Sequence, residues 1–150
     1  MSVVGERFGE IPEVFAQARS ALQSHIDHWG FRASRSEYEA VLRSCDVVVS
    51  TAEHEFFGIA IVEAVSAGCV PVLPRRLAYP DLFANEFLYD GSTLGLVARL
   101  AELSRLKAGI GRLVSPPRAI LERFSWTNAA QQMDDLLDQT VRISGNGGRD

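Results

Sequence analysis

Residues 47–73 read VVVSTAEHEFFGIAIVEAVSAGCVPVL, in which two short apolar runs enclose a longer apolar stretch. The run 47–50 is rich in β-branched residues, which is typical of a strand that is covered on both faces. Residues 57–67 are almost wholly apolar and predict a buried helix, which Gly68 would end. The run 70–73 predicts the next strand. A strand, a helix and a second strand in this order indicate a βαβ unit of a parallel sheet.

The same alternation continues on both sides, so the predicted fold class is α/β, a Rossmann-like parallel sheet with helices on both faces. Residues 1–143 are predicted to form this domain, and the Gly-rich residues 144–150 a flexible tail. The other predicted strands lie at residues 3–4, 26–29 and 87–89. The other predicted helices begin at Pro12, at the capping box Ser36-x-x-Glu39, at Ser92 or Thr93 (running to about Leu106), at Pro116-Pro117 and at Asn128. Apolar residues predicted to face the core are Val14, Phe15, Ala18 and Leu22 in the first helix, and Ala130, Met133, Leu136 and Leu137 in the last.

Composition limits the classes of protein that the chain can represent. Its 150 residues suffice for one compact domain, and its net charge of −4 gives no general attraction to a nucleic-acid backbone. No apolar run is long enough for a transmembrane helix and no secretory signal is visible, which predicts a cytoplasmic protein. Cys45 and Cys69 each border an apolar run and predict small buried residues in a reducing compartment. His25, His28 and His54 lack the spacing of metal ligands, so no metal site is expected.

The loop and helix start that follow the strand at 47–50 are the candidate ligand site, because ligands of open α/β sheets bind outside the carboxyl ends of the strands. The free amides of a helix start favour phosphate, and Gly58 would let a ligand approach the backbone closely. Glu55 precedes the predicted helix and Glu63 lies within it, so the two carboxylates could hold two sugars on either side of a pyrophosphate. Spacing alone leaves an alternative equally open, in which Glu63 is an ordinary solvent-facing glutamate.

Three segments of the chain together resemble a known enzyme family. They are His28-Trp29-Gly30-Phe31 with Ser34-Arg35 and Tyr38; Ser50-Thr51-Ala52 with residues 54–58; and Leu73-Pro74 with Arg76-Leu77 and Tyr79-Pro80. One sequence pattern resembles the E-x7-E region of retaining nucleotide-sugar glycosyltransferases with the GT-B fold. The pattern is Glu55-Phe-Phe-Gly58, then Glu63-Ala64, then Gly68-x-x-Pro71-Val72. More narrowly, the three segments are similar to the tRNA-queuosine mannosyltransferase family, from about Val4 to Leu137. The resemblance implies the C-terminal, donor-binding half of such an enzyme.

The resemblance also implies a role for each matching position. Glu63 would bind the ribose hydroxyls of the sugar nucleotide, and Glu55 would lie near the transferred hexose as the catalytic position. Beside the diphosphate would lie Phe56, Phe57 and Gly58, together with Leu77, Ala78 and Tyr79, which replace the paired glycines of many relatives but could still offer backbone amides. Gly30 and Phe31 would lie near the nucleobase, and Gly5, Glu6 and Arg7 on the phosphate side of the cleft, although Arg7 could equally be a surface charge. Phe15, Tyr38, Phe124 and Trp126 are predicted to be scaffold residues.

The implied reaction is transfer of a hexose, mannose from GDP-mannose, with retention and without a cofactor, to queuosine in tRNA. The first predicted strand stands at the start of the chain and would leave a bare sheet edge, which a partner or a longer polypeptide must cover. We expect the second case, with tRNA bound through a missing N-terminal domain and only weak activity in the isolated chain. Two alternatives remain open: a non-catalytic nucleotide-sugar-binding module or remnant that needs a partner domain, and a doubly wound domain with no sugar ligand.

Overall fold

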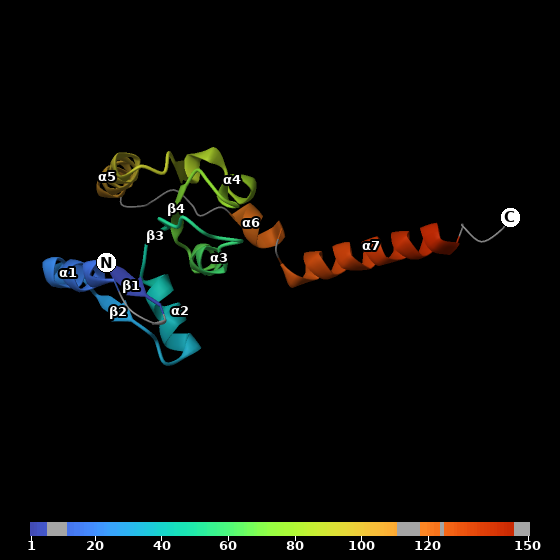
Figure 1. Ribbon diagram of the computed structural model, residues 1–150, viewed down its shortest axis with the longest axis horizontal. Helices are drawn as coiled ribbons and strands as arrows, with labels where there is room; N and C mark the ends of the chain where they lie inside the picture. The colour runs from blue at the N-terminus through green and yellow to red at the C-terminus, as the bar shows by residue number, and fades with distance from the viewer. Residues whose placement is uncertain (6–11, 111–117, 124, 146–150) are drawn as a thin grey trace. The chain divides into compact units, whose positions relative to one another are not determined.

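The computed structural model describes residues 1–5, 12–110, 118–123 and 125–145, and it divides into two compact units, Met1–Pro116 and Pro117–Asp150 (Figure 1). The first unit carries all five described strands: β1 (Ser2–Val4), β2 (His28–Gly30), β3 (Val47–Val49), β4 (Val70–Pro74) and β5 (Leu88–Tyr89). Its helices are α1 (Glu13–Ala21), α2 (Arg35–Arg43), α3 (Ile59–Ser66), α4 (Tyr79–Leu82) and α5 (Thr93–Ile110), with short 3-10 turns at Gln23–His25 and Asn85–Phe87. The second unit contains α6 (Arg118–Arg123) and α7 (Trp126–Gly145).

All strand pairs are parallel, which confirms the predicted α/β, Rossmann-like class. The described strands form two sheets, one of β1 and β2 and one of β3, β4 and β5. In the larger sheet Val47 lies opposite Val70, and Leu73 opposite Leu88. The βαβ unit predicted from residues 47–73 is therefore β3, α3 and β4.

Helices cover both faces of the larger sheet. On one face, Leu42 of α2 packs with Ala64 of α3 and with Cys69, and Val48 of β3 lies against this cluster. On the other face, Leu103 of α5 packs with Val72 and Tyr89, and Val47 lies against that cluster. Successive residues of a strand point to opposite faces, so β3 contributes to both clusters. The central strand β4 is buried along its whole length, as a strand of a doubly covered parallel sheet should be.

The cysteine side chains follow the expectation of a structural role. Both thiols are free; Cys69 is buried and Cys45 is half-buried. The Cys69 thiol donates to the carbonyl oxygen of Leu42. Burial raises the pKa of this thiol to about 11, so it stays protonated at neutral pH and is a poor nucleophile.

Two helix starts were predicted at the wrong residue. Ser34, not Ser36, caps α2, because its hydroxyl oxygen accepts a hydrogen bond from the Glu37 amide at 3.2 Å. Helix α7 begins at Trp126 rather than Asn128, and the Ser125 hydroxyl accepts from the Asn128 amide at 3.3 Å. Each segment offers more than one hydroxyl or amide side chain that could cap a helix, and the sequence does not decide between them. The expected start at Pro116-Pro117 lies outside the described residues.

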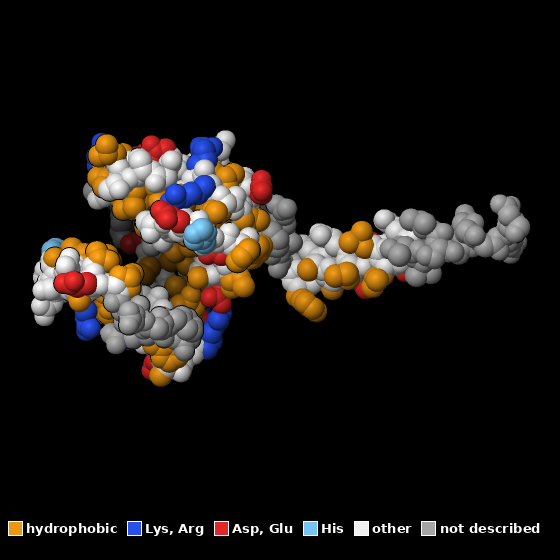
Figure 2. Space-filling view, in the orientation of Figure 1, with side chains coloured by type: hydrophobic (Ala, Val, Ile, Leu, Met, Phe, Trp, Pro, Cys, Tyr) orange, Lys and Arg blue, Asp and Glu red, His pale blue; other side chains and the backbone are white. Residues whose placement is uncertain are grey.

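Several apolar side chains that were predicted to face the core are exposed. They are Val14, Phe15 and Leu22 in and after α1, and Met133, Leu136 and Leu137 in α7. The Trp126 side chain, predicted to be scaffold, is also exposed, and hydrophobic side chains are visible along α7 in Figure 2. Helix α1 lies between the two strands of the smaller sheet in the chain, and a sheet of two strands offers too little apolar surface to cover a helix face. Among the described residues, no helix is both long and apolar enough to cross a membrane.

Candidate functional site

The loops that follow β3 and β4 lie at one rim of the larger sheet. The two strands are parallel neighbours, so their carboxyl ends point the same way. The Ser50 amide, directly after β3, donates to the carbonyl oxygen of Val72 at 3.1 Å. The structure therefore brings the start of the Glu55 loop close to the segment that follows β4, as expected for a site at the carboxyl ends of the strands.

A buried hydroxyl network ties these two loops together. The hydroxyls of Ser50 and Tyr79 lie 2.9 Å apart, and the Tyr89 hydroxyl donates to the Ser50 carbonyl oxygen at 3.1 Å. The Ala52 amide completes the network by donating to the Ser50 hydroxyl oxygen at 3.2 Å. Tyr79 is fully buried, and this burial raises the pKa of its phenol. Its side chain is therefore a structural member of the rim, whereas the expectation for its backbone amide remains a prediction.

We predict that Tyr79→Phe lowers the free energy of unfolding by about 1–2 kcal/mol, because it leaves a buried hydroxyl with one partner fewer. Ser50→Ala should have a similar effect, and urea unfolding measures both. In the double variant the second change should cost much less than the first, since both remove the same bond. Strictly additive costs would show that the Ser50–Tyr79 bond does not link the loops.

The Glu55 carboxylate binds two backbone amides in the loop directly before helix α3. Its Oε1 accepts hydrogen bonds from the amides of Phe57 at 3.3 Å and Gly58 at 2.9 Å. A negative charge at a helix start is stabilised by the amides and the dipole found there. The helix was predicted to begin at Phe57, so these two amides were expected to be free for a phosphate; α3 begins instead at Ile59, and the chain's own carboxylate accepts from both amides. The neighbouring Phe56 side chain is fully exposed.

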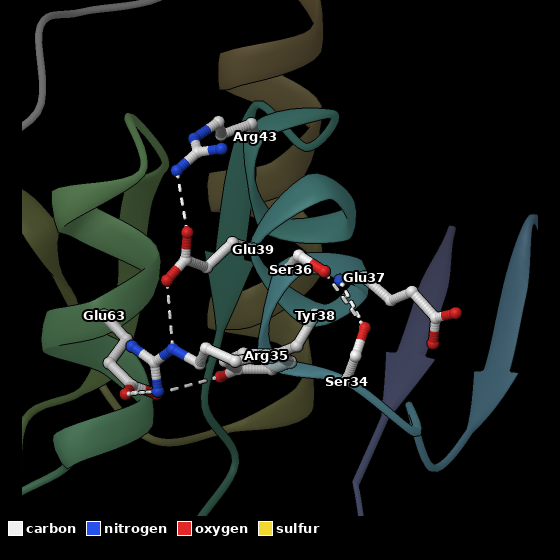
Figure 3. Close-up of polar contacts among 8 residues, drawn as sticks. All are labelled: Ser34, Arg35, Ser36, Glu37, Tyr38, Glu39, Arg43 and Glu63. Atoms are coloured by element: carbon white, nitrogen blue, oxygen red, sulfur yellow. Dashed lines mark hydrogen bonds and ion pairs between the residues drawn. The ribbon is translucent and has the colours of Figure 1, made fainter.

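Glu63 lies on α3 and faces α2 (Figure 3). A guanidinium nitrogen of Arg35, Nη1, donates to Glu63 Oε1 at 2.7 Å, and the Tyr38 hydroxyl donates to Oε2 at 3.1 Å. The bond to Glu63, followed by a bond to Glu39, raises the pKa of the Arg35 guanidinium. Burial, and then the Glu63 charge, raise the pKa of the Tyr38 phenol. The half-buried Glu63 carboxylate thus has one donor on each oxygen, so it is not an ordinary solvent-facing glutamate.

A second ion pair holds Arg35 in place. Its Nε donates to Glu39 Oε1 at 3.0 Å, and Glu39 Oε2 accepts from Arg43 at 2.8 Å. The guanidinium also lies over the Tyr38 ring, 5.7 Å from the ring centroid. Sequence reasoning missed Arg35 as a partner of Glu63 and treated Tyr38 as scaffold only. Their spacing of three residues on one helix was the available signal, since such residues share a helix face.

Two comparisons with known proteins bear on the family of the chain. Residues 13–133 match the family of glycosyl transferases group 1. The chain belongs to this glycosyltransferase family. It is also similar to the tRNA-queuosine alpha-mannosyltransferase of Drosophila melanogaster, with 39% identity over 106 residues. This match covers 71% of the chain but only 28% of the Drosophila protein, so the chain spans little more than a quarter of that relative.

The loop that follows β4 in this glycosyltransferase chain contains a residue with left-handed backbone conformation. Leu77 has a φ of 60° and is the one residue other than glycine with positive φ among those that the structure describes. Left-handed backbone costs an ordinary residue roughly 1–2 kcal/mol, and such strain concentrates at functional sites. By the resemblance described above, Leu77 stands where many relatives carry a glycine, and its observed conformation is one that glycine adopts freely.

We predict that Leu77→Gly raises the free energy of unfolding by up to about 1 kcal/mol, because the left-handed strain disappears while the unfolded chain gains freedom. Ala78→Gly is the matched control: Ala78 has φ −74°, so the change relieves nothing and should lower the free energy of unfolding. Chemical denaturation of both variants measures the two effects. Destabilisation of equal size in both variants would contradict the strain assigned to Leu77.

Gly5, Gly30 and Phe31, which were also predicted for the site, lie at the ends of the smaller sheet. The Gly5 amide donates to the Gly30 carbonyl oxygen at 3.4 Å, which places the ends of β1 and β2 together. Gly30 has a φ of 94°, and the Phe31 side chain that follows it is exposed. Glu6 and Arg7 lie outside the described residues.

Proposed function

We propose that this chain is the donor-binding part of a retaining hexosyltransferase, and that its donor is GDP-mannose. The proposal rests mainly on Glu63, whose carboxylate is held by Arg35 and Tyr38 on the helix that follows β3. A carboxylate has about four lone-pair positions, and here two of them already accept a hydrogen bond. The remaining lone-pair positions could accept hydrogen bonds from the vicinal hydroxyls of a nucleotide ribose.

Glu55 lies directly before the same helix, and its proposed role is to bind the hexose. Both of its described hydrogen bonds use Oε1, which leaves Oε2 to accept from a hydroxyl of the hexose. The acceptor hydroxyl would attack from the face of the leaving group, and the departing diphosphate would help to take its proton, so that no protein nucleophile is needed. Fixed amide dipoles and positive side chains would stabilise the charge that develops on the diphosphate.

Mannose and queuosine enter the proposal through the name of the Drosophila relative and through the resemblance of the motifs, and GDP through that resemblance alone. The acceptor would be queuosine in tRNA, bound largely by a domain outside this chain, and the reaction would take place in the cytoplasm. Because the chain spans 28% of that relative, a second candidate is a nucleotide-sugar-binding module that contributes to catalysis only with a partner domain.

Calorimetric titration of GDP-mannose into the wild type and into Glu55→Ala and Glu63→Ala variants tests the donor assignment. We expect both variants to bind more weakly than the wild type. Unchanged affinity in both would leave a doubly wound domain without a sugar ligand as the better description. A mannosyl-transfer assay with queuosine-containing tRNA tests whether the chain depends on another domain: we expect little turnover by the isolated chain, and rapid turnover would contradict that dependence.

A further inference from the structure

One arginine in the loop after β4 has a buried side-chain nitrogen without a hydrogen-bond partner. Among the described residues, the Nε atoms of Arg32, Arg76 and Arg99 are buried and unpaired. A buried N–H group that has lost water and gained no partner destabilises a fold, so such groups are few in native proteins and each needs a physical reason. Of the three arginines, Arg76 lies in the loop that carries Leu77 and Tyr79.

The other two arginines differ from Arg76 in their surroundings. The terminal nitrogens of Arg99 are both bound, because Nη1 donates to Glu102 at 2.6 Å and Nη2 donates to the carbonyl oxygen of Glu86. Arg32 follows β2 in the smaller sheet. Arg76 follows the buried central strand of the larger sheet, and none of the ion pairs between described side chains includes it.

The backbone fixes Arg76 close to the start of α3. The Arg76 amide donates to the Pro74 carbonyl oxygen at 2.7 Å, so the chain turns sharply where β4 ends. Tyr79 follows three residues later, and a Cβ on Gly58 would lie 3.1 Å from its ring. Three residues of chain span at most about 11 Å. The Arg76 backbone therefore lies within that distance of a side chain that touches the residue directly before α3.

The charges described at this rim are unfavourable for an anionic ligand without a further cation. Glu55 accepts hydrogen bonds from two backbone amides and belongs to none of the described ion pairs. The charge of Glu63 is paired with Arg35, which also binds Glu39. A diphosphate that enters beside these carboxylates is repelled by them, and the dipole of a helix start offsets only part of that repulsion.

We propose that Arg76 binds the diphosphate of the sugar nucleotide. This inference rests on the proposed function and adds to it a residue of this chain that neutralises the charge of the donor. A guanidinium is planar and always charged, and it can donate two parallel hydrogen bonds to phosphate oxygens. A bound phosphate thus supplies the partner that the side chain lacks, so a single interaction accounts for the unpaired nitrogen and for the charge balance. The unpaired nitrogen is then a cost in stability that serves binding.

Titration calorimetry with GDP and GMP tests the proposal, and the neighbouring arginine offers a matched control. The wild type should bind GDP more tightly than GMP. Arg76→Met should weaken GDP binding about tenfold or more and remove most of that preference, whereas Arg76→Lys, which keeps the charge but not the planar fork, should fall between the two. Arg75→Met removes the same charge from the same loop, but Nη1 of Arg75 is bound to Asn85, so its affinities should equal those of the wild type.

An unchanged GDP-to-GMP ratio in Arg76→Met, or an equal loss in Arg75→Met, would overturn the proposal. The same holds if Arg76→Met weakens the binding of tRNA but not of GDP, since Arg76 would then contact the acceptor. A wild type that binds GDP through its ribose hydroxyls but shows no effect of Arg76→Met would leave the proposed function standing, whereas a wild type without affinity for GDP would remove both.

Urea unfolding separates this role from a structural one. Methionine keeps the apolar length of the side chain and removes the unpaired N–H group, so the unfolding midpoint of Arg76→Met should equal or exceed that of the wild type. A clearly lower midpoint would mean that Arg76 stabilises the fold through contacts within the chain, and it would contradict the assignment of its guanidinium to a ligand.

Discussion

Glu63→Gln should weaken the binding of GDP-mannose about tenfold or more. The neutral amide loses the charge that Arg35 stabilises, and hydrogen bonds to a charged group contribute about 1.5–3 kcal/mol each. Loss of the ribose contact should also remove the preference for a nucleotide that carries both ribose hydroxyls. The wild type should bind GDP more tightly than 2′,3′-dideoxy-GDP, and Glu63→Gln should bind the two nearly equally. Titration calorimetry with both nucleotides measures this ratio.

Arg35→Met and Tyr38→Phe should reduce the same ratio, because each removes a donor that orients the Glu63 carboxylate. Glu37→Gln is the matched control: Glu37 lies in the same helix, but its side chain points away from Glu63 in Figure 3. Its ratio should equal that of the wild type. A wild type that binds the two nucleotides equally would contradict the ribose role of Glu63. An Arg35→Met variant with the wild-type affinity ratio would contradict only the positioning role of Arg35.

The βαβ unit around α3 could be predicted from sequence because local patterning and tertiary burial agree there. The valines of β3, the apolar helix and the buried β4 are continuous apolar runs whose lengths suit two strands and a helix, and Gly68 marks the helix end with a φ of 110°. The same local consistency fails in α1, whose apolar side chains form a stripe that the described neighbours do not cover. Periodicity reports a tendency to be buried, and burial itself needs a surface to pack against.

The candidate site was predictable in its positions but not in its contacts. Glu55 stands out in the sequence as a charge three residues before Gly58, and Glu63 as a charge within an apolar helix. Their partners depend on tertiary structure, because Arg35 and Tyr38 come from another helix and reach Glu63 across 28 and 25 residues of chain. Tyr79 shows the opposite case: it resembled a ligand contact in the sequence, yet its ring and hydroxyl are part of the buried support beneath the loops.

That support explains the second large effect that we expect. Gly58→Val should lower the free energy of unfolding by about 3 kcal/mol, because it combines two costs. Gly58 has a φ of 84°, which is strained for a β-branched residue, and a Cβ at this position would lie 3.1 Å from Cε1 of Tyr79. The Tyr79 ring cannot retreat without breaking its bond to Ser50, so crowding adds to the strain.

Gly68→Val separates the two costs. Gly68 also has positive φ, 110°, but a Cβ there meets nothing within 4 Å, so only the conformational cost of about 1–2 kcal/mol should appear. Urea unfolding of the two variants gives the difference, which measures how firmly the Tyr79 ring is fixed. Equal destabilisation would mean that the Tyr79 ring moves aside easily and that the loops at this rim of the sheet are flexible. A clear excess at Gly58 would mean that the amides holding Glu55 are set by a rigid buried network, so that the carboxylate keeps its position before any donor binds.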